Sequence, residues 1–113
     1  MEFYTPRKLK FKAWNVESKL LMRLNAIDCV KGELMKKGHI LLQYTEMTDK
    51  QYEELYEMDV VPLATDKFVI TWGSNPAGWY LIKLTDPQTR QMFLQEQART
   101  MIRLCSYFES VKE

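Results

Sequence analysis

The chain has 113 residues, 46% of them hydrophobic and 27% charged, the composition of one soluble globular domain that needs no metal or disulfide support. A formal net charge of +1 gives no general excess of positive charge for binding phosphates. No apolar run approaches the ~20 residues of a membrane span, and no secretion signal is apparent, so we expect a cytoplasmic protein without a membrane partner. Cys29 and Cys105 lack CxxC spacing and are expected to be reduced, buried and inert.

The N-terminal part of the chain is predicted to consist of strands and turns. Residues 9–15, LKFKAWN, alternate apolar and basic side chains, which indicates a half-buried strand with a basic outer face. Residues 20–24 are predicted to form the returning strand, whereas residues 26–38 are ambiguous and most plausibly contain strand and turns punctuated by glycines. The apolar run at residues 39–45 predicts a strand buried on both faces.

The segment from 43 to 61, QYTEMTDKQYEELYEMDVV, contains six acidic residues, three tyrosines and no glycine or proline. Thr48 and Gln51 fit a capping box, in which each side chain satisfies the backbone N–H of the other residue. The side chains that follow at helical spacing are Tyr52, Leu55 and Tyr56. We therefore predict a short helix over residues 49–57, packed against the rest of the domain because two turns are marginal alone.

The C-terminal half is predicted to contain a strand, a hairpin and a long helix. Residues 59–64 form a strand in which Pro62 marks an edge or a bulge. Two apolar runs, 67–72 and 79–84, flank the turn-forming GSNPAG and predict a hairpin. From residue 87 to residue 111 no helix breaker follows the proline, and apolar side chains recur at helical spacing. The expected fold is one domain, residues 1–113, mainly β with helical additions (α+β), built on a strongly bent antiparallel sheet or small barrel.

Charge is distributed unevenly along the sequence. Residues 1–40 carry nine Lys and Arg against four Asp and Glu, residues 41–66 carry one against seven, and residues 67–113 carry six against four. Two interpretations are open: the basic and acidic segments face each other or are solvated, or they form a bipolar surface that favours head-to-tail self-association. We favour the first, because charge blocks in one sequence are weak evidence for assembly.

No catalytic or cofactor motif is present in the sequence. It contains no GxGxxG, Walker A lysine, GxSxG elbow or Cys–His pair with an orienting acid. The single histidine, His39, has no Cys, Asp or Glu at ligand spacing, so we expect no metal site. Glu53, Glu54 and Glu57 resemble paired carboxylates, but on an exposed helix they would keep ordinary pKa values, and a solvated face is favoured. We predict a protein that is not an enzyme and has no cofactor.

The three tryptophans each lie on a predicted strand near a turn. Two interpretations are open for them: they fill the ends of a small β core, which we favour, or they form an exposed platform that stacks bases or anchors a peptide. Basic side chains of the first strand, Arg7 among them, would line a nucleic-acid groove beside such a platform. The candidate residues of this nucleic-acid or partner surface are Lys8, Lys10, Lys12, Trp14, Trp72 and Trp79.

The helix predicted over residues 87–111 is apolar over a wider arc than one face of a small barrel covers. Exposure of the surplus would form a patch larger than monomers usually carry, and twofold pairing of like helices would cover it, so we predict a homodimer. The alternative is that the open end of the barrel covers the whole arc. The candidate self-association residues are Phe93, Leu94, Met101, Ile102, Cys105 and Phe108.

Two segments resemble the YopX-like proteins, a family encoded mainly by phages and prophages. That family begins with a strand of the form F-R-A-W-D, where this chain has F-K-A-W-N at residues 11–15. It continues with Q-Y-T-G-L-x-D-x-x-G-x-x-I-Y-E-G-D-I-V, which aligns without a gap to residues 43–61. The identical positions are Gln43, Tyr44, Thr45, Asp49, Tyr56, Glu57, Asp59 and Val61, and the conservative changes are Met47, Leu55 and Val60. The resemblance covers roughly residues 9–84.

Three glycines of the family pattern are replaced here by Glu46, Tyr52 and Met58. Because glycine supplies positive φ in tight turns, we expect those turns to be rebuilt, with the segment converted into the helix at 49–57. The resemblance implies an SH3-like, partly open small β-barrel over residues 1–84, with the helix of residues 85–113 as an addition. It implies no known reaction or cofactor.

The function expected from these observations is that of a phage- or mobile-element-derived accessory protein, acting as a non-catalytic protein-interaction and oligomerisation module. A host or phage protein is a possible partner besides a second copy of the chain. The alternative is an SH3-like nucleic-acid-binding module that uses the basic N-terminal strand and exposed aromatic side chains.

Overall fold

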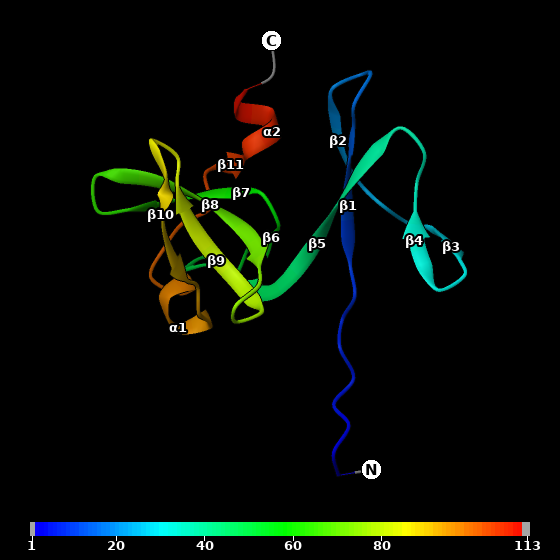
Figure 1. The fold of residues 1–113 in the computed structure, drawn as a ribbon, viewed down its shortest axis with the longest axis horizontal. Coiled ribbons are helices and arrows are strands. Elements are labelled where there is room, and N and C mark those ends of the chain that lie inside the picture. The colour runs from blue at the N-terminus through cyan, green and yellow to red at the C-terminus, as the bar shows by residue number, and fades with distance from the viewer. Residues whose placement is uncertain (1, 112–113) are drawn as a thin grey trace.

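The computed structural model describes residues 2–111, and Figure 1 shows their arrangement. The protein is mainly β, as predicted. Its strands are β1 (Phe11–Asn15), β2 (Leu20–Arg23), β3 (Asp28–Val30), β4 (Glu33–Met35), β5 (His39–Thr48), β6 (Glu54–Tyr56), β7 (Asp59–Leu63), β8 (Asp66–Gly73), β9 (Gly78–Lys83), β10 (Asp86–Met92) and β11 (Cys105–Ser106). The helices in the described residues are α1 (Gln95–Ala98) and α2 (Tyr107–Ser110).

The strands pair into two larger antiparallel sheets and one small hairpin. One sheet has the strand order β2-β1-β5-β6, and the other has the order β10-β9-β8-β7-β11. β3 and β4 pair with each other as a two-stranded unit. The predicted bent antiparallel sheet is present as a curled half-barrel.

The hairpin predicted over residues 67–84 is confirmed as β8 and β9. The two strands pair in register up to Gly73, which lies opposite Gly78 at the turn. β-Branched and aromatic side chains fit this pleated, largely buried surface, and the intervening turn formers reverse the chain. Gly73 is required by packing, because a Cβ there would lie 2.7 Å from the ring of Tyr80.

β5 links two parts of the molecule that differ in packing. Its first half, up to Gln43, pairs with β1, and its second half, from Tyr44, pairs with β6. We call residues 11–43 the arm and residues 44–111 the body. In Figure 1 the arm lies to the right of the curled sheet, and β5 runs from one to the other.

The hydrophobic core cluster lies in the body. Its members are Met47, Leu55, Val61, Phe68, Ile70, Trp79, Leu81, Phe93, Ala98 and Met101. The radius of gyration is 14.8 Å, larger than the about 13 Å of a compact chain of this length. The excess reflects the arm and the extended N-terminal segment, which project from the body (Figure 1).

The arm exposes much of its apolar surface. Every residue of β3 and β4 is exposed. β5, predicted to be buried on both faces, has Ile40 exposed as its second residue. The exposed large hydrophobic side chains of the arm are Val16, Leu20, Val30, Leu34, Met35 and Ile40. With Phe3, Tyr4 and Leu9 of the preceding segment, they are more than half of those among the described residues.

The helix predicted over residues 49–57 is wrong. The chain makes a turn after β5 and returns as β6, whose Glu54–Tyr56 pair with the end of β5. Asp49 organises this turn, since its side chain accepts the backbone N–H groups of Gln51 and Glu53. Thr48 forms no capping box, and its backbone instead exchanges hydrogen bonds with the side chain of Gln95.

Glu46, Tyr52 and Met58 all have positive φ, at 68°, 63° and 70°. These are the positions at which the family pattern carries glycine. Non-glycine residues therefore hold positive φ at all three positions, and the expected conversion of this segment into a helix does not occur. Left-handed backbone conformations at non-glycine residues cost roughly 1–2 kcal/mol each.

Met58→Gly is expected to raise the free energy of unfolding by about 0.5–1 kcal/mol, because glycine accepts the positive φ without strain. The matched control is Met92→Gly in β10, where the methionine is exposed in an extended strand and glycine brings only an entropic cost. Urea unfolding of both variants measures the difference. Equal destabilisation by the two substitutions would contradict strain at Met58.

The single long helix predicted over residues 87–111 is also wrong. β10 occupies the free edge of β9, and the backbone N–H of Phe93 continues this edge by donating to Trp79 at 2.9 Å. A chain reversal at α1 then brings Met101 into the core, and the chain returns along β7 as β11. The apolar residues at helical spacing are therefore distributed over β10, α1, β11 and α2. Pairing with the sheet edges satisfies the backbone N–H and C=O groups that a helix would satisfy internally.

Candidate functional site

Asp49 is a fully buried carboxylate that joins the β5–β6 turn to the C-terminal segment. Its Oδ1 accepts the backbone N–H groups of Gln51 and Glu53 at 2.8 and 2.9 Å, and its Oδ2 accepts the N–H of Arg103 at 2.8 Å. Burial alone would raise the pKa of Asp49, but these three donors and the nearby guanidinium outweigh it and lower the pKa. The lone pairs that chemistry would use are engaged in structural hydrogen bonds.

Asp59 is a second buried carboxylate directed at the same arginine. Its Oδ2 accepts the backbone N–H of Tyr56 at 2.8 Å and lies 2.9 Å from Nε of Arg103. Burial raises the pKa of Asp59, and the guanidinium opposes that rise. Arg103 also approaches Glu53 at 3.7 Å and Glu109 at 3.9 Å. The acidic segment thus forms a structural ion-pair network around one arginine.

The basic residues predicted for the first strand do not gather on one open face. Lys12 is buried, its Nζ lies 4.4 Å from the ring centroid of Tyr56, and burial lowers its pKa against the opposing charge of Asp59. Lys10 pairs with Glu54 at 2.5 Å. Lys8 is exposed. The outer basic face predicted for residues 9–15 is therefore wrong at Lys12.

Basic and acidic segments do face each other, as the favoured interpretation of the charge pattern predicts. Arg7 pairs with Glu46 at 2.5 Å, and Lys10 of the same basic segment pairs with Glu54 of the acidic segment. These pairs join residues about forty positions apart in the sequence. Partly exposed pairs of this kind contribute little individually, so they orient the N-terminal segment more than they stabilise it.

Two of the three tryptophans are buried. Trp14 stacks on Phe108 with ring centroids 5.5 Å apart, and Trp79 belongs to the core cluster. Trp72 is 56% exposed and meets Trp79 edge-on at 5.0 Å and 78°. Core packing is therefore confirmed for Trp14 and Trp79, whereas Trp72 is a surface residue. The candidate nucleic-acid surface is dispersed, because Trp14 and Lys12 are not accessible.

The six candidate self-association residues do not share one face. Phe93 and Met101 are buried in the core cluster, while Leu94 and Ile102 are exposed. Cys105 is partly buried in β11. Phe108 is partly buried in α2 beneath the indole of Trp14. The apolar arc predicted for a helix at this end of the chain is thus divided between core and surface.

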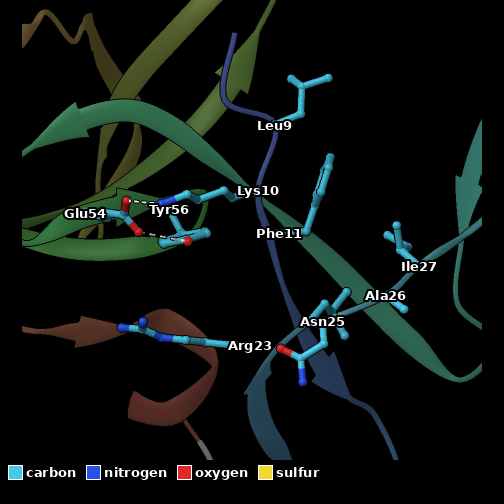
Figure 2. Close-up of a pocket in the computed structure, with 10 residues that line it drawn as sticks. Leu9, Lys10, Phe11, Arg23, Asn25, Ala26, Ile27, Glu54 and Tyr56 are labelled. Carbon is cyan, nitrogen blue, oxygen red and sulfur yellow. Dashed lines mark hydrogen bonds and ion pairs between the residues drawn. The ribbon is translucent and has the colours of Figure 1, made fainter.

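A pocket of about 410 Å³ lies where the N-terminal segment, the loop after β2 and β6 meet (Figure 2). Lys10, Glu54 and Tyr56 form a chain of contacts on one side of it, and Arg23 extends alone below them in the view of Figure 2. Burial and the Glu54 carboxylate raise the pKa of Tyr56 to about 12, so its hydroxyl stays protonated and donates to Glu54. Leu9, Phe11, Leu24, Asn25, Ala26 and Ile27 complete the lining.

A second pocket, of about 290 Å³, lies at the hairpin end of the body. It is lined by Arg7, Gln43, Glu57, Trp72 and Trp79. Glu57 is partly buried in the β6–β7 turn, where its backbone N–H donates to Gln43 at 2.8 Å. Burial raises the pKa of Glu57, and the Gln43 backbone opposes the rise. The sequence placed Glu57 on a solvated helix face and did not associate it with the tryptophans.

The described residues hold no group of three or more His, Cys, Asp or Glu placed to bind a metal ion. His39 contacts the carbonyl of Lys37 through Nδ1 at 2.9 Å. Both cysteines are unpaired thiols, and Cys29 is exposed, contrary to the prediction that it is buried. Within residues 2–111, no helix has the length and apolar character needed to cross a bilayer.

No family model matches the sequence, and no curated protein matches it. Among solved structures, the fold is similar to that in "Crystal structure of protein EF1440 from Enterococcus faecalis", with a TM-score of 0.60. The match covers 91% of this chain and 95% of that chain at 15% sequence identity. Because so little of the chain is left out, the shared fold includes most of the arm as well as the body.

Proposed function

We propose that the protein is a non-catalytic interaction module that self-associates through its arm. The observation that carries this proposal is the contrast between the two parts of the chain. The arm contributes nothing to the core cluster, yet it and the preceding segment hold more than half of the exposed large hydrophobic side chains. Exposed apolar surface marks interaction sites in soluble proteins where its side chains gather into one patch.

The β3–β4 hairpin is the part of the arm that most needs a partner. A two-stranded hairpin is marginal in water without packing, and all residues of these two strands are exposed. The similar fold at 15% identity includes most of the arm, which supports a role for it that the core does not explain.

A second copy of the chain is the partner that the hairpin fits best. The hairpin carries both signs of charge beside its apolar residues, with Asp28 and Glu33 against Lys31 and Lys36. Twofold antiparallel pairing of two such hairpins therefore places unlike charges opposite each other while it buries like apolar side chains. A formal net charge of only +1 opposes association weakly.

Light scattering over a range of concentrations tests the proposal. The measured mass is expected to rise from 13.5 kDa towards twice that value as concentration increases. Val30→Lys together with Met35→Lys should return it to the monomer, because both side chains are half exposed on one face of the hairpin and neither supports the core. In a paired hairpin the added positive charges would face like charges of the second copy. A monomer mass at every concentration would refute self-association.

The control for the interface is Leu94→Lys together with Ile102→Lys, which places the same charges on exposed apolar residues of the C-terminal segment. This control should leave the dimer intact. If it dissociates the dimer and the hairpin variant does not, the interface lies in the C-terminal segment. Circular dichroism of each variant verifies that the β structure is retained.

The resemblance to the YopX-like proteins supports the further proposal of an SH3-like, partly open barrel of phage or mobile-element origin. Positive φ at Glu46, Tyr52 and Met58, the three positions at which that family carries glycine, supports it. Identical residues of the pattern also have structural roles here, since Asp49 and Asp59 both bind the Arg103 segment. An accessory role in a host cell follows from this origin by association only.

Nucleic-acid binding gains no support from the residues first considered for it. A stacking platform beside a basic groove requires an accessible Trp14 and free lysines on one face. Trp14 is covered by Phe108, Lys12 is buried and Lys10 is paired with Glu54.

A further inference from the structure

We propose that the pocket between Trp72, Trp79 and Glu57 binds the alkylammonium group of a small molecule or of a modified lysine side chain. This inference concerns the end of the body at the turn between β8 and β9, and it does not depend on self-association through the arm. Trp72 and Trp79 are opposite each other in β8 and β9, so their arrangement is fixed by the register of the hairpin. Both tryptophans line the pocket, together with Glu57, Arg7 and Gln43.

The aromatic geometry suits a cation. The two indoles meet at 78° with centroids 5.0 Å apart, so the pocket is bounded by two steeply inclined rings, of which Trp72 is exposed and Trp79 is largely buried. Trp72 leaves 56% of its surface in water, an unusual exposure for the largest apolar side chain. Tryptophan gives the strongest cation–π attraction of the aromatic residues, and walls of this kind recognise quaternary and methylated ammonium groups.

Glu57 supplies the opposite charge. Among residues 2–111 its carboxylate takes part in none of the ion pairs, although the side chain is partly buried. Arg7 lines the same pocket, but its Nε is engaged by Glu46. A desolvated carboxylate without a counter-ion is unfavourable. A cation that enters the pocket would therefore be attracted both by the Glu57 carboxylate and by the indole surface.

The size of the pocket limits the ligand to a small head group. A volume of about 290 Å³ accommodates a trimethylammonium group with a short chain and is near the lower limit of typical ligand sites. The carboxylate selects a positive charge, and the apolar indoles favour a methylated ammonium over a strongly hydrated primary one. The chain already contains one such contact, since the guanidinium of Arg99 lies 3.9 Å from the ring centroid of Tyr52.

Titration of the full chain with choline, followed by the indole N–H signals in NMR spectra, tests the site. We expect saturable shifts of the Trp72 signal, and 3,3-dimethylbutanol, the uncharged analogue of choline, should bind at least about tenfold more weakly. A peptide bearing trimethyllysine, compared with the unmodified peptide, distinguishes a protein-borne ligand from a free one. Equal binding of choline and its uncharged analogue, or no shift at about 50 mM choline, would overturn the proposal.

Two variants separate the contributions of charge and ring. Glu57→Gln keeps the shape of the side chain and Trp72→Ala removes only an exposed indole, so each is expected to weaken choline binding by about tenfold with the fold intact. For Trp72→Ala the Trp79 signal reports binding. Tyr52→Ala removes an exposed aromatic ring outside the pocket and should leave affinity unchanged. Unchanged choline affinity in either pocket variant would refute the site. Self-association through the arm is tested separately, by the mass measured in light scattering.

Discussion

Asp49→Ala is expected to lower the free energy of unfolding by about 3 kcal/mol or more, one of the largest effects of any single substitution in this chain. The substitution leaves three backbone N–H groups, those of Gln51, Glu53 and Arg103, without their acceptor. Each unsatisfied buried donor costs about 1–3 kcal/mol, and the turn and the C-terminal segment lose their common anchor. Urea unfolding followed by tryptophan fluorescence measures the loss.

Asp86→Ala is the matched control for Asp49→Ala. Asp86 also accepts a backbone N–H two residues ahead, that of Gln88, and additionally the hydroxyl of Thr89, but it lies on the surface. Water replaces its hydrogen bonds, so only a small change in stability is expected. Equal losses in the two variants would mean that burial of Asp49 does not determine its contribution.

The lowered pKa of Asp49 also predicts how stability depends on acid. A carboxyl group whose pKa is lower in the folded state stabilises fully above its unfolded pKa of about 3.9, and this contribution disappears as pH falls through the folded value. The wild type should therefore lose more stability than Asp49→Asn on acidification below about pH 4. Parallel losses in the two proteins would contradict this assignment.

Arg103→Met is expected to destabilise the body by about 3–5 kcal/mol, because it leaves the carboxylate of Asp59 buried without its principal counter-charge. Asp59→Asn should cost less, since Arg103 retains Glu53 and Glu109 nearby and asparagine can still accept from Tyr56. In the double variant no unpaired buried carboxylate remains at residue 59. The double variant is therefore expected to lose clearly less than the sum of the two single losses.

The measurement is a double-mutant cycle from urea unfolding, and the expected coupling between Asp59 and Arg103 is about 1–3 kcal/mol. The control cycle pairs Asp66→Asn with Lys83→Met, an ion pair at 3.4 Å whose side chains are about a third exposed. Exposed pairs couple by less than about 1 kcal/mol. Additive losses in the Asp59–Arg103 cycle would show that the two residues act independently.

Elements could be predicted from the sequence where the local pattern of apolar residues and turn formers agrees with the strand pairing in the structure. The hairpin of β8 and β9 has apolar runs on both sides of a turn-forming segment. The strand β1 was predicted from the alternation of residues 9–15, although Lys12 is buried and not on an outer basic face. The opposition of basic and acidic segments was likewise readable from the charge blocks, because ion pairs need only proximity. Burial of Trp14 and Trp79 followed from the general behaviour of indoles in small β cores.

The segments that failed depend on contacts far apart in the sequence. Residues 49–57 have helical spacing, but Asp49 makes its third hydrogen bond to a residue 54 positions away, and no local pattern reports it. At the C-terminal end, Cys105 pairs with Val60 on β7, 45 positions earlier. β10, in contrast, pairs with the neighbouring strand β9. Positive φ at Tyr52 and Met58 also escapes prediction, since the residues themselves disfavour it.

The pocket beside Trp72 was missed for a related reason. Both of its tryptophans were identified as candidate surface residues, but Glu57 was assigned to an exposed helix. Its true position in the β6–β7 turn places it beside the hairpin end. The available signal was the family pattern, which carries glycine at the position directly after Glu57. A turn at that position excludes a helix through Glu57.

The position of Arg103 near the C-terminal end has a consequence for folding during synthesis. Its partners Asp49 and Asp59 are synthesised more than forty residues earlier, so on the ribosome they emerge before the guanidinium and the amide that satisfy them. Until residues 101–106 appear, the nascent body has two acidic groups that it cannot bury and a β7 edge without β11. Native structure in the body is therefore expected to form late and in one step, and chains halted before Arg103 should be sensitive to proteases.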